Sequence, residues 1–351
     1  MTRHYILAVF ILLALSSCGP RDRYISFSGY AQGGTYTVKL NLNGRDGMIK
    51  ARPEAIRDSV DAILSKIDNT LSGYNSNSIL SRFNAGDRVE AADMFIDIYQ
   101  RSYGFYVETD GALDVASAPL FDIWGFGFKN GKMPSDAQVK AVMRDSGMKR
   151  LHEDMGKCVG DDGRLEAVEM LRVESKVRPS LNYNAVAQGY SCDVVAEYLY
   201  SLGVKDMMVD IGEIFCDGKN PSGRPWTIGI DRPVDGNDQV GADIHGIFRI
   251  PEGPCGVVTS GNYRKFYVKD GRKYAHTIDP RTGYPVEHNL LSATIVAPDA
   301  TMADAYATYC MVIGLEAAKE FLMAREDLEG CLIFDNDGVF SNWTSPGFTL
   351  E

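Results

Sequence analysis

The sequence predicts an α+β fold, built as one large domain or as two intimately packed ones. Three observations predict it. Several short runs are rich in β-forming residues, and a few longer segments repeat apolar residues at helical spacing. The chain is also long enough to bury a large core, since it has 351 residues of which 45% are hydrophobic.

The predicted helices and strands are spread along the whole chain. The clearest helix spans 52–71, where Ile56, Val60, Ile63, Leu64 and Ile67 share one face and Pro53 stands in the first turn. Further helices are predicted over 78–83, 92–109 and 134–147, after Asn184 through Leu199, and after Pro298 with Thr301 as its cap. The predicted strands are 25–30, 36–40, one that ends at Asn184, 205–214, 226–231 and 292–296.

A hairpin over residues 256–285 carries the densest group of polar residues. Two β-rich runs, 256–259 and 265–269, surround a Ser-Gly-Asn turn, and a second turn at 270–271 returns the chain toward 274–278. His276, Thr277 and Asp279 follow at a strand end, where a rigid sheet commonly positions a functional loop. The residues alone leave a second interpretation open, in which Asp279 only bonds turn amides.

Composition excludes some classes of partner. The chain carries 36 basic and 47 acidic residues, a formal net charge of −11, and no basic run, so nucleic acid is not an expected partner. An anionic substrate would be repelled unless a metal ion or local donors offset this charge. The cysteines after Cys18 form no CxxC pair, which favours free buried thiols over a cysteine metal site.

The first residues resemble a bacterial lipoprotein signal. An apolar run at 6–15, too short to span a bilayer, follows Arg3 and precedes Leu15-Ser16-Ser17-Cys18. We expect residues 1–17 to be the signal peptide, Cys18 the lipidated residue, 18–28 a tether and 29–351 the functional domain. The expected location is the periplasm-facing membrane surface of a bacterial cell envelope. The alternative is a plain secretory signal with a chance cysteine.

Asp304 and Thr308 predict an oxygen-rich site on the last long helix. Because they are four residues apart, they share one helical face. Together with a main-chain carbonyl from elsewhere they would form an oxygen-only site, which suits Mg²⁺. Asp304 as a charge in the first turn of the helix is the alternative.

Several stretches together resemble the ApbE family, the FAD:protein FMN transferases. They are "AQGGT" at 31–35, "LSGYNSNSILSRFN" at 71–84, "TDGALDVASAPLFDIWGFG" at 109–127, "LNYNAVAQGYSCDVVAEYL" at 181–199, "TSGNYRKFY…HTIDPRTGYP" at 259–285 and "ADAYAT" at 303–308. They occur in the order of the family and cover about residues 29–330. The resemblance implies a duplicated T-fold-like core with FAD in a cleft between its halves.

The resemblance also implies roles for particular residues. The implied FAD contacts are Gln32, Tyr74, Ala112, Leu113, Asp114, Asn182, Gln188 and Ile278. The implied Mg²⁺ ligands are the Ala185 carbonyl, Asp304 and Thr308. For Tyr74 a loop aromatic on the edge of the core, and for Asp114 an N-cap, remain alternatives. The chain departs from the family pattern at Gly34, Asn182, Gln188, the single Gly212 and Ala307.

The main functional hypothesis is that FMN passes from FAD to a threonine of an exported protein, and AMP leaves. The expected partners are flavin-acceptor subunits of membrane redox complexes. His276 is the predicted general base, because its ordinary pKa of about 6.5 suits proton transfer near neutrality; a structural hydrogen bonder is the alternative. Two other functions stay open: an Mg²⁺-dependent FAD pyrophosphatase, and a lipoprotein that binds FAD without chemistry.

Overall fold

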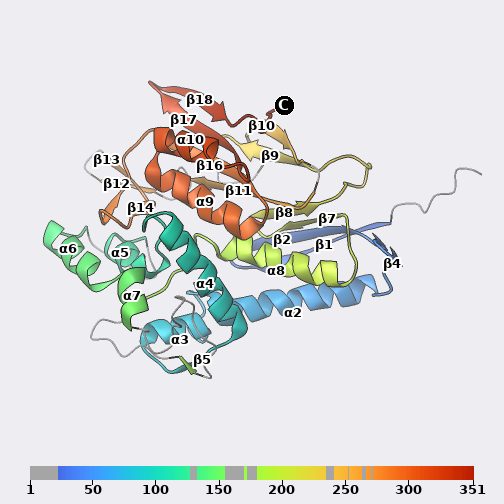
Figure 1. Cartoon of the computed structure of the whole chain (residues 1–351), viewed down its shortest axis with the longest axis horizontal. Helices are drawn as coiled ribbons and strands as arrows, with labels where there is room; N and C mark the ends of the chain where they lie inside the picture. Colours follow the sequence, from blue (N-terminus) through green and yellow to red (C-terminus); the bar gives the residue numbers. More distant parts are fainter. Residues whose placement is uncertain are drawn as a thin grey trace, which may run out of the picture.

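An eight-stranded antiparallel sheet forms the centre of the computed structural model, which describes residues 23–126, 133–154, 170–171, 180–234, 241–251, 253–262, 266–269 and 272–351. The strands, in spatial order, are β1 (Tyr24–Ala31), β2 (Gly34–Asn41), β7 (Met207–Asp210), β8 (Ile214–Asp217), β11 (Cys255–Gly261), β16 (Leu290–Ala297), β17 (Glu329–Asn336) and β18 (Val339–Thr344). Helices cover one face of this sheet (Figure 1), so the predicted α+β class is confirmed.

The sheet consists of two halves with the same order of elements. In the first half, β1 and β2 lead through helices including α2 (Pro53–Leu71) and α8 (Ala187–Ser201) to β7 and β8. In the second half, β11 and β16 lead through α9 (Ala300–Ile313) and α10 (Leu315–Met323) to β17 and β18. The repeated order is the duplicated core that the resemblance implied.

Strand alternation divides the core between the two faces of the sheet, because successive side chains in a strand point to opposite sides. Val258, Ile295 and Leu332 pack with α9 and α10 on the helical face. Their neighbours Val257, Val296 and Ile333 pack on the other face with the hairpin of β9 (Thr227–Asp231) and β10 (Ile244–Arg249). In the second half of the sheet, β11, β16 and the first part of β17 are therefore buried on both faces.

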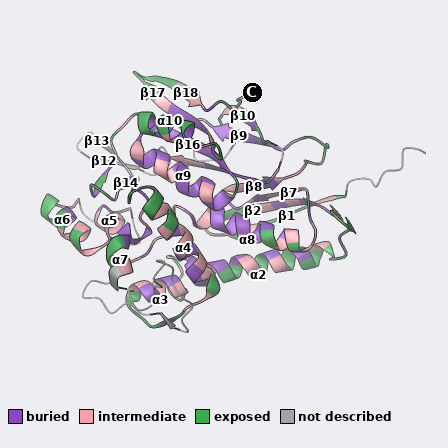
Figure 2. Ribbon diagram, in the orientation of Figure 1, coloured by how far each residue is buried: buried purple, intermediate pink, exposed green. Residues whose placement is uncertain are grey.

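Two helices lie at the centre of the helical layer. α8 and α9 pack against each other, and Figure 2 shows both as largely buried, whereas α2 exposes its outer face. α2 has the predicted pattern: Ile56, Val60, Leu64 and Ile67 are buried, and Pro53 is its first residue. Because α8 and α9 bury most of the surface with which they face each other and the sheet, their relative position is strongly determined by packing.

Shorter elements complete the fold. The helical ones are α3 (Ile79–Ala85), α4 (Asp93–Glu108), the 3₁₀ turn η1 (Val115–Ser117), α5 (Ala118–Ile123), α6 (Asp136–Asp145) and α7 (Met148–Asp154). The remaining strands are β3 (Asn43–Gly44), β4 (Gly47–Met48), β5 (Val89–Glu90), β6 (Met170–Leu171), β12 (Phe266–Lys269), β13 (Arg272–Ala275), β14 (Ile278–Asp279) and β15 (Tyr284–Pro285). Most of the predicted helices and strands are therefore confirmed.

The structure corrects four predictions. No strand ends at Asn184, because the amides of Leu181 and Asn182 bond the Asn84 side chain and the Val115 carbonyl rather than a neighbouring strand. The runs 256–259 and 265–269 do not pair as the predicted hairpin, because β11 pairs with β8 and β16, whereas β12 pairs with β13. Thr301 is not the cap of α9; Asp299 is, and it accepts from the Met302 amide at 2.7 Å. The predicted tether is too long, since residues 24–28 belong to β1.

The predicted leader and Cys18 lie outside the described residues. Within the described part of the chain, no helix combines the length and apolar character needed to cross a membrane. Of the later cysteines, Cys192, Cys216, Cys255, Cys310 and Cys331 are free and buried, as expected. Cys158 also lies outside the described residues.

Candidate active site

A single cavity of about 750 Å³ collects every predicted site residue that the structure describes. It lies between α2, α4 and the start of α8 on one side and α9 and the end of β11 on the other, so both halves of the fold contribute to it. Its volume is in the upper part of the range typical of cofactor sites. The predicted residues in its wall are Gln32, Tyr74, Ala112, Leu113, Asp114, Asn182, Ala185, Gln188, His276, Ile278, Asp304 and Thr308.

Asp304 sits where α8 and α9 cross. Its Oδ2 accepts a hydrogen bond from the Gly189 amide at 3.1 Å, and the side chain is 4% exposed. Burial raises the pKa of this carboxyl above its ordinary value. A buried carboxylate with a single amide donor is poorly compensated, so a cation at this position would stabilise its charged form.

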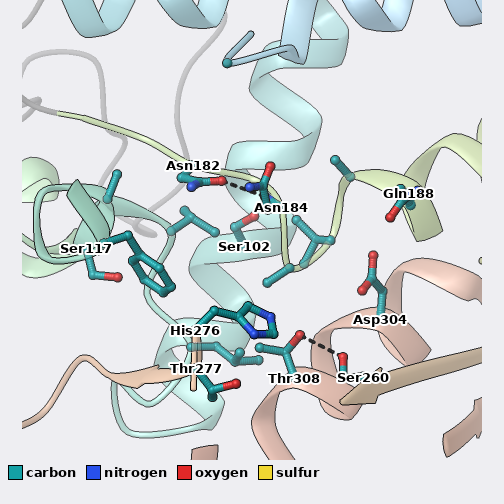
Figure 3. Close-up of a pocket in the computed structure, with 18 of the residues that line it drawn as sticks. Ser102, Ser117, Asn182, Asn184, Gln188, Ser260, His276, Thr277, Asp304 and Thr308 are labelled. Carbon is teal, nitrogen blue, oxygen red and sulfur yellow. Dashed lines mark hydrogen bonds between the residues drawn. The ribbon is translucent and has the colours of Figure 1, made fainter. Parts of the chain in front are cut away.

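Hydroxyl groups continue this polar wall. The Thr308 and Ser260 hydroxyls lie 3.3 Å apart, and Figure 3 shows both beside Asp304. Ser260 is not among the residues predicted from the sequence, although strand alternation contained a signal: Ser260 shares a face of β11 with Val258, which packs on the helical side. Asp304, Thr308, Ser260 and Ala185 line the same cavity, and their side-chain and main-chain oxygens are the kind of ligand that Mg²⁺ prefers. Among the described residues no three His, Cys, Asp or Glu side chains gather into a metal cluster.

The bend before α8 is held by its own side chains. Asn182 Oδ1 accepts from the Asn184 amide at 2.9 Å, which places Asn184 and Ala185 at the cavity wall (Figure 3). Gln188 Nε2 donates to the Ile211 carbonyl at 3.1 Å, and a Cβ on Gly212 would lie 2.4 Å from that nitrogen. The φ of Gly212 is +93°, so its backbone conformation favours glycine in the turn between β7 and β8, and the absence of a Cβ leaves room for the Gln188 amide.

Asp114 has a structural role in addition to its predicted one. It caps η1 through the Ala116 amide at 2.8 Å, and both of its oxygens accept from the Met148 amide. Burial raises its pKa to about 6, although the amides of Met148 and Ala116 oppose that shift. The N-cap alternative is therefore observed, and contact with FAD stays a prediction for this residue.

Two predicted residues mark the edges of the cavity. Gln32 has a positive φ of 51° and donates a hydrogen bond to Ser191 on α8, which fixes the tip of the β1–β2 hairpin. Tyr74 is 77% exposed, so it stands at the mouth of the cavity rather than in the core. At the opposite wall, Ile278 is buried against Leu120, Trp124 and Val139 and carries the chain from His276 into β14.

The charge of the wall is one-sided. Among the described lining residues the carboxylates are Asp68, Asp114, Glu213 and Asp304, and there is no lysine or arginine. An anionic ligand is therefore repelled unless a cation accompanies it. This agrees with the expectation from the net charge that a metal ion or local donors must offset the repulsion.

Fold and site together define a protein with a duplicated α+β core and a cavity of about 750 Å³ that residues of both halves line. The ApbE family matches residues 33–332. The FAD:protein FMN transferase of Haemophilus influenzae is 33% identical over 350 residues, which cover 98% of this chain and 96% of that protein. The Escherichia coli K12 protein of the same name is 33% identical over 86% of this chain and 83% of its own length.

Solved structures agree with the sequence relatives. The flavin transferase ApbE from Vibrio cholerae superposes with a TM-score of 0.75 and 28% identity, covering 93% of this chain and 98% of that one. The apo flavinyl transferase ApbE of Pseudomonas stutzeri has a TM-score of 0.75 and 30% identity, covering 93% and 95%. The chain belongs to the ApbE family.

Proposed function

We propose that the chain is an FAD:protein FMN transferase that moves FMN from FAD to a threonine of an exported protein. One observation carries this proposal: residues matched to the family's site, from segments between Gln32 and Thr308, all line one cavity. The mixture of apolar wall and polar centre suits a ligand with two ring systems joined by a sugar and a diphosphate.

Mg²⁺ fits the residues that are present. Asp304, Thr308 and the Ala185 carbonyl would hold it, and Ser260 adjoins them. All are oxygen donors, and the described part of the wall offers no lysine or arginine as another counter-charge for the diphosphate. When bound, the ion would supply charge neutralisation on the diphosphate oxygens.

The reaction exchanges one phosphorus–oxygen bond for another. The threonine oxygen of the acceptor forms a bond to the FMN phosphorus, the bond from that phosphorus to the bridging oxygen breaks, and AMP leaves with the electron pair. We assign His276 as the base that takes the threonine proton, since it lines the same cavity. The closely packed α8 and α9 hold the groups around the diphosphate in place, which is the orientation that phosphoryl transfer requires.

Mass spectrometry of a threonine-containing acceptor peptide after incubation with FAD and Mg²⁺ tests the proposal. We expect an FMN adduct on the peptide and one AMP per adduct. Asp304→Ala should abolish the Mg²⁺-dependent adduct, and His276→Ala should slow it about 10²- to 10⁴-fold. Ser59→Ala, on the outer helix α2, is the control and should retain the parental rate.

The same assay separates the alternatives. AMP and free FMN without any adduct would identify an FAD pyrophosphatase, and tight FAD binding without AMP would identify a carrier. Parental adduct formation by His276→Ala would refute the assignment of the base. A Mg²⁺ requirement that survives Asp304→Ala would refute the metal site.

We also propose that Cys18 is lipidated and holds the enzyme at the periplasm-facing membrane surface, where subunits of membrane redox complexes would be its acceptors. The sequence before Cys18 supports this. Cys18→Ser should lose incorporation of an alkyne-labelled palmitate and leave the membrane fraction. Continued labelling of that variant would contradict the proposal.

A further inference from the structure

Ser102 is a buried polar residue on an otherwise apolar helix face. It lies on α4, whose other buried residues are Phe95, Ile96, Ile98 and Tyr99, and it is 2% exposed. Both Ser102 and Phe105, one turn further along, line the cavity. Figure 3 shows the Ser102 side chain among the polar groups of the cavity, together with Asn184, His276 and Thr308.

Among the residues that the structure describes, the Ser102 hydroxyl has no hydrogen-bond partner. Other serines and threonines in or at the ends of helices donate to the carbonyl four residues earlier. They are Ser59 at 2.9 Å, Thr70 at 2.8 Å, Thr109 and Ser146 at 2.7 Å, and Ser191 at 2.6 Å. Ser102 has the Ile98 carbonyl at the same spacing and does not use it, so its hydroxyl is left to the cavity.

An unpartnered buried hydroxyl destabilises the protein that contains it. Alanine at this position would remove the unpaired group, and it has the higher helix propensity. Buried polar groups in proteins nearly always have a partner, and an exception in the wall of a binding cavity is explained if the partner is the ligand. The position of Ser102 therefore indicates a group that becomes satisfied when the cavity is filled.

We propose that Ser102 binds the flavin dinucleotide by donating a hydrogen bond to an oxygen of its sugar–phosphate middle. The proposal rests on the proposed function, because it takes FAD as the ligand. Aromatic and aliphatic side chains such as Phe105, Phe121 and Leu71 suit the two ring systems. The polar side chains that surround Ser102 in Figure 3 suit the oxygen-rich part between the rings.

Equilibrium binding of FAD in the presence of Mg²⁺ tests the assignment on the full chain. Ser102→Ala and Ser102→Cys, which retains the shape but donates poorly, should each weaken FAD binding about three- to tenfold. The melting temperature of the ligand-free Ser102→Ala protein should be equal to or above that of the parent. Ser59→Ala, whose hydroxyl has its own carbonyl partner outside the cavity, should bind FAD like the parent.

Two results would overturn the assignment. One is an FAD dissociation constant for Ser102→Ala within twofold of the parental value, which is expected if the hydroxyl only holds a water molecule. The other is an equal loss for lumiflavin, which has the ring system but no sugar or phosphate. A parent that binds FAD but releases no AMP would refute the proposed function alone, since the Ser102 comparison needs only binding.

Discussion

The Gly189 amide donates to Asp304 Oδ2 at 3.1 Å, at the point where α8 and α9 approach most closely. A Cβ on Gly189 would lie 2.1 Å from the Ala300 carbonyl oxygen and 2.9 Å from the Asp304 Cβ. Only glycine permits this approach. One helix crossing therefore both buries the carboxylate assigned to the metal and fixes its distance from the start of α8.

Gly189→Ala should separate the two helices, because the contact it creates is with backbone and not with a movable side chain. Overpacking of this kind costs about 1–3 kcal/mol or more of unfolding free energy. We expect urea unfolding to show a loss of unfolding free energy of this size. AMP release should also require a higher Mg²⁺ concentration to reach half of its maximal rate.

The matched control is Gly104→Ala on α4. A Cβ there meets no atom within 4 Å, so alanine should raise the unfolding free energy by about 0.5–1 kcal/mol. If Gly189→Ala is as stable and as active as the parent, the close approach of α8 and α9 does not exist in solution.

Asp193 holds the same pair of helices from the other side. It lies on α8, and its carboxylate accepts from the Ala300 and Thr301 amides, both at 2.8 Å, and from the Thr301 hydroxyl. Asp193→Ala leaves these buried donors unpaired, so we expect a loss of about 2–4 kcal/mol in urea unfolding. Asp193→Asn retains one acceptor oxygen, so it should lose less unfolding free energy than Asp193→Ala.

Asp299→Ala separates this effect from ordinary capping. Asp299 is the N-cap of α9 and bonds only the Met302 amide among the described contacts, so its loss should cost about 1 kcal/mol. Equal losses of unfolding free energy for Asp193→Ala and Asp299→Ala would show that the hydrogen bonds to Asp193 on α8 contribute no more than an ordinary helix cap.

These two carboxylates also show what the sequence could and could not predict about the fold. Apolar spacing and turn residues act locally, and they predicted α2, α4, α6 and most strands within one or two residues. The cap of α9 was assigned to Thr301 because a hydroxyl near a helix start is the usual signal. The cap is instead Asp299, directly before the helix. Thr301 bonds Asp193, which lies 108 residues away in the chain, and no local pattern contains such a contact.

The candidate site divides in the same way. The residues that the family motifs indicated line one cavity, and their individual roles stay predictions. The motifs did not predict that Gln188 is tied to the Ile211 carbonyl, that Asp114 accepts from the Met148 amide, or that Ser102 and Ser260 complete the wall. Those features depend on which segments meet after folding.

His152 should make stability sensitive to mild acid. Its ring stacks on Tyr103 at 4.2 Å, its Nδ1 lies 3.3 Å from the Tyr99 hydroxyl, and burial lowers its pKa below the ordinary value of 6.5. As pH falls through 6.5 the unfolded chain takes up the proton first, so the folded state loses stability until the folded pKa is reached.

His152→Gln removes this titration, so the drop in melting temperature between pH 7.5 and 5.5 should be smaller in the variant. The raised pKa of Asp114 has the opposite sign, because the folded state takes up that proton first. The titration of Asp114 occurs in both the parent and His152→Gln, so it cancels when their melting temperatures are compared. An equal fall in melting temperature between pH 7.5 and 5.5 for the parent and the variant would refute the prediction.

The wall that carries His276 depends on a contact between Trp124 and Gly283. The Trp124 indole donates to the Gly283 carbonyl at 2.8 Å, which joins the end of α5 to the β14–β15 hairpin that begins beside His276. Gly283 has a φ of +80°, and a Cβ there would lie 2.6 Å from both Val139 and Met143. The hairpin is thus held against α5 and α6 by a hydrogen bond and by close packing.

Trp124→Phe removes this donor and leaves the Gly283 carbonyl without it, which costs about 1–3 kcal/mol. Because the displaced hairpin carries Ile278 and begins beside His276, we expect the KM for FAD to rise several-fold and kcat to fall. Tyr284→Phe, which loses only an exposed bond to Asp136 at 2.7 Å, should change neither constant by more than about twofold. A Trp124→Phe enzyme that loses stability but keeps the parental KM would show that the hairpin does not position the flavin wall. The effect on KM, rather than on stability, therefore decides whether this contact serves the site.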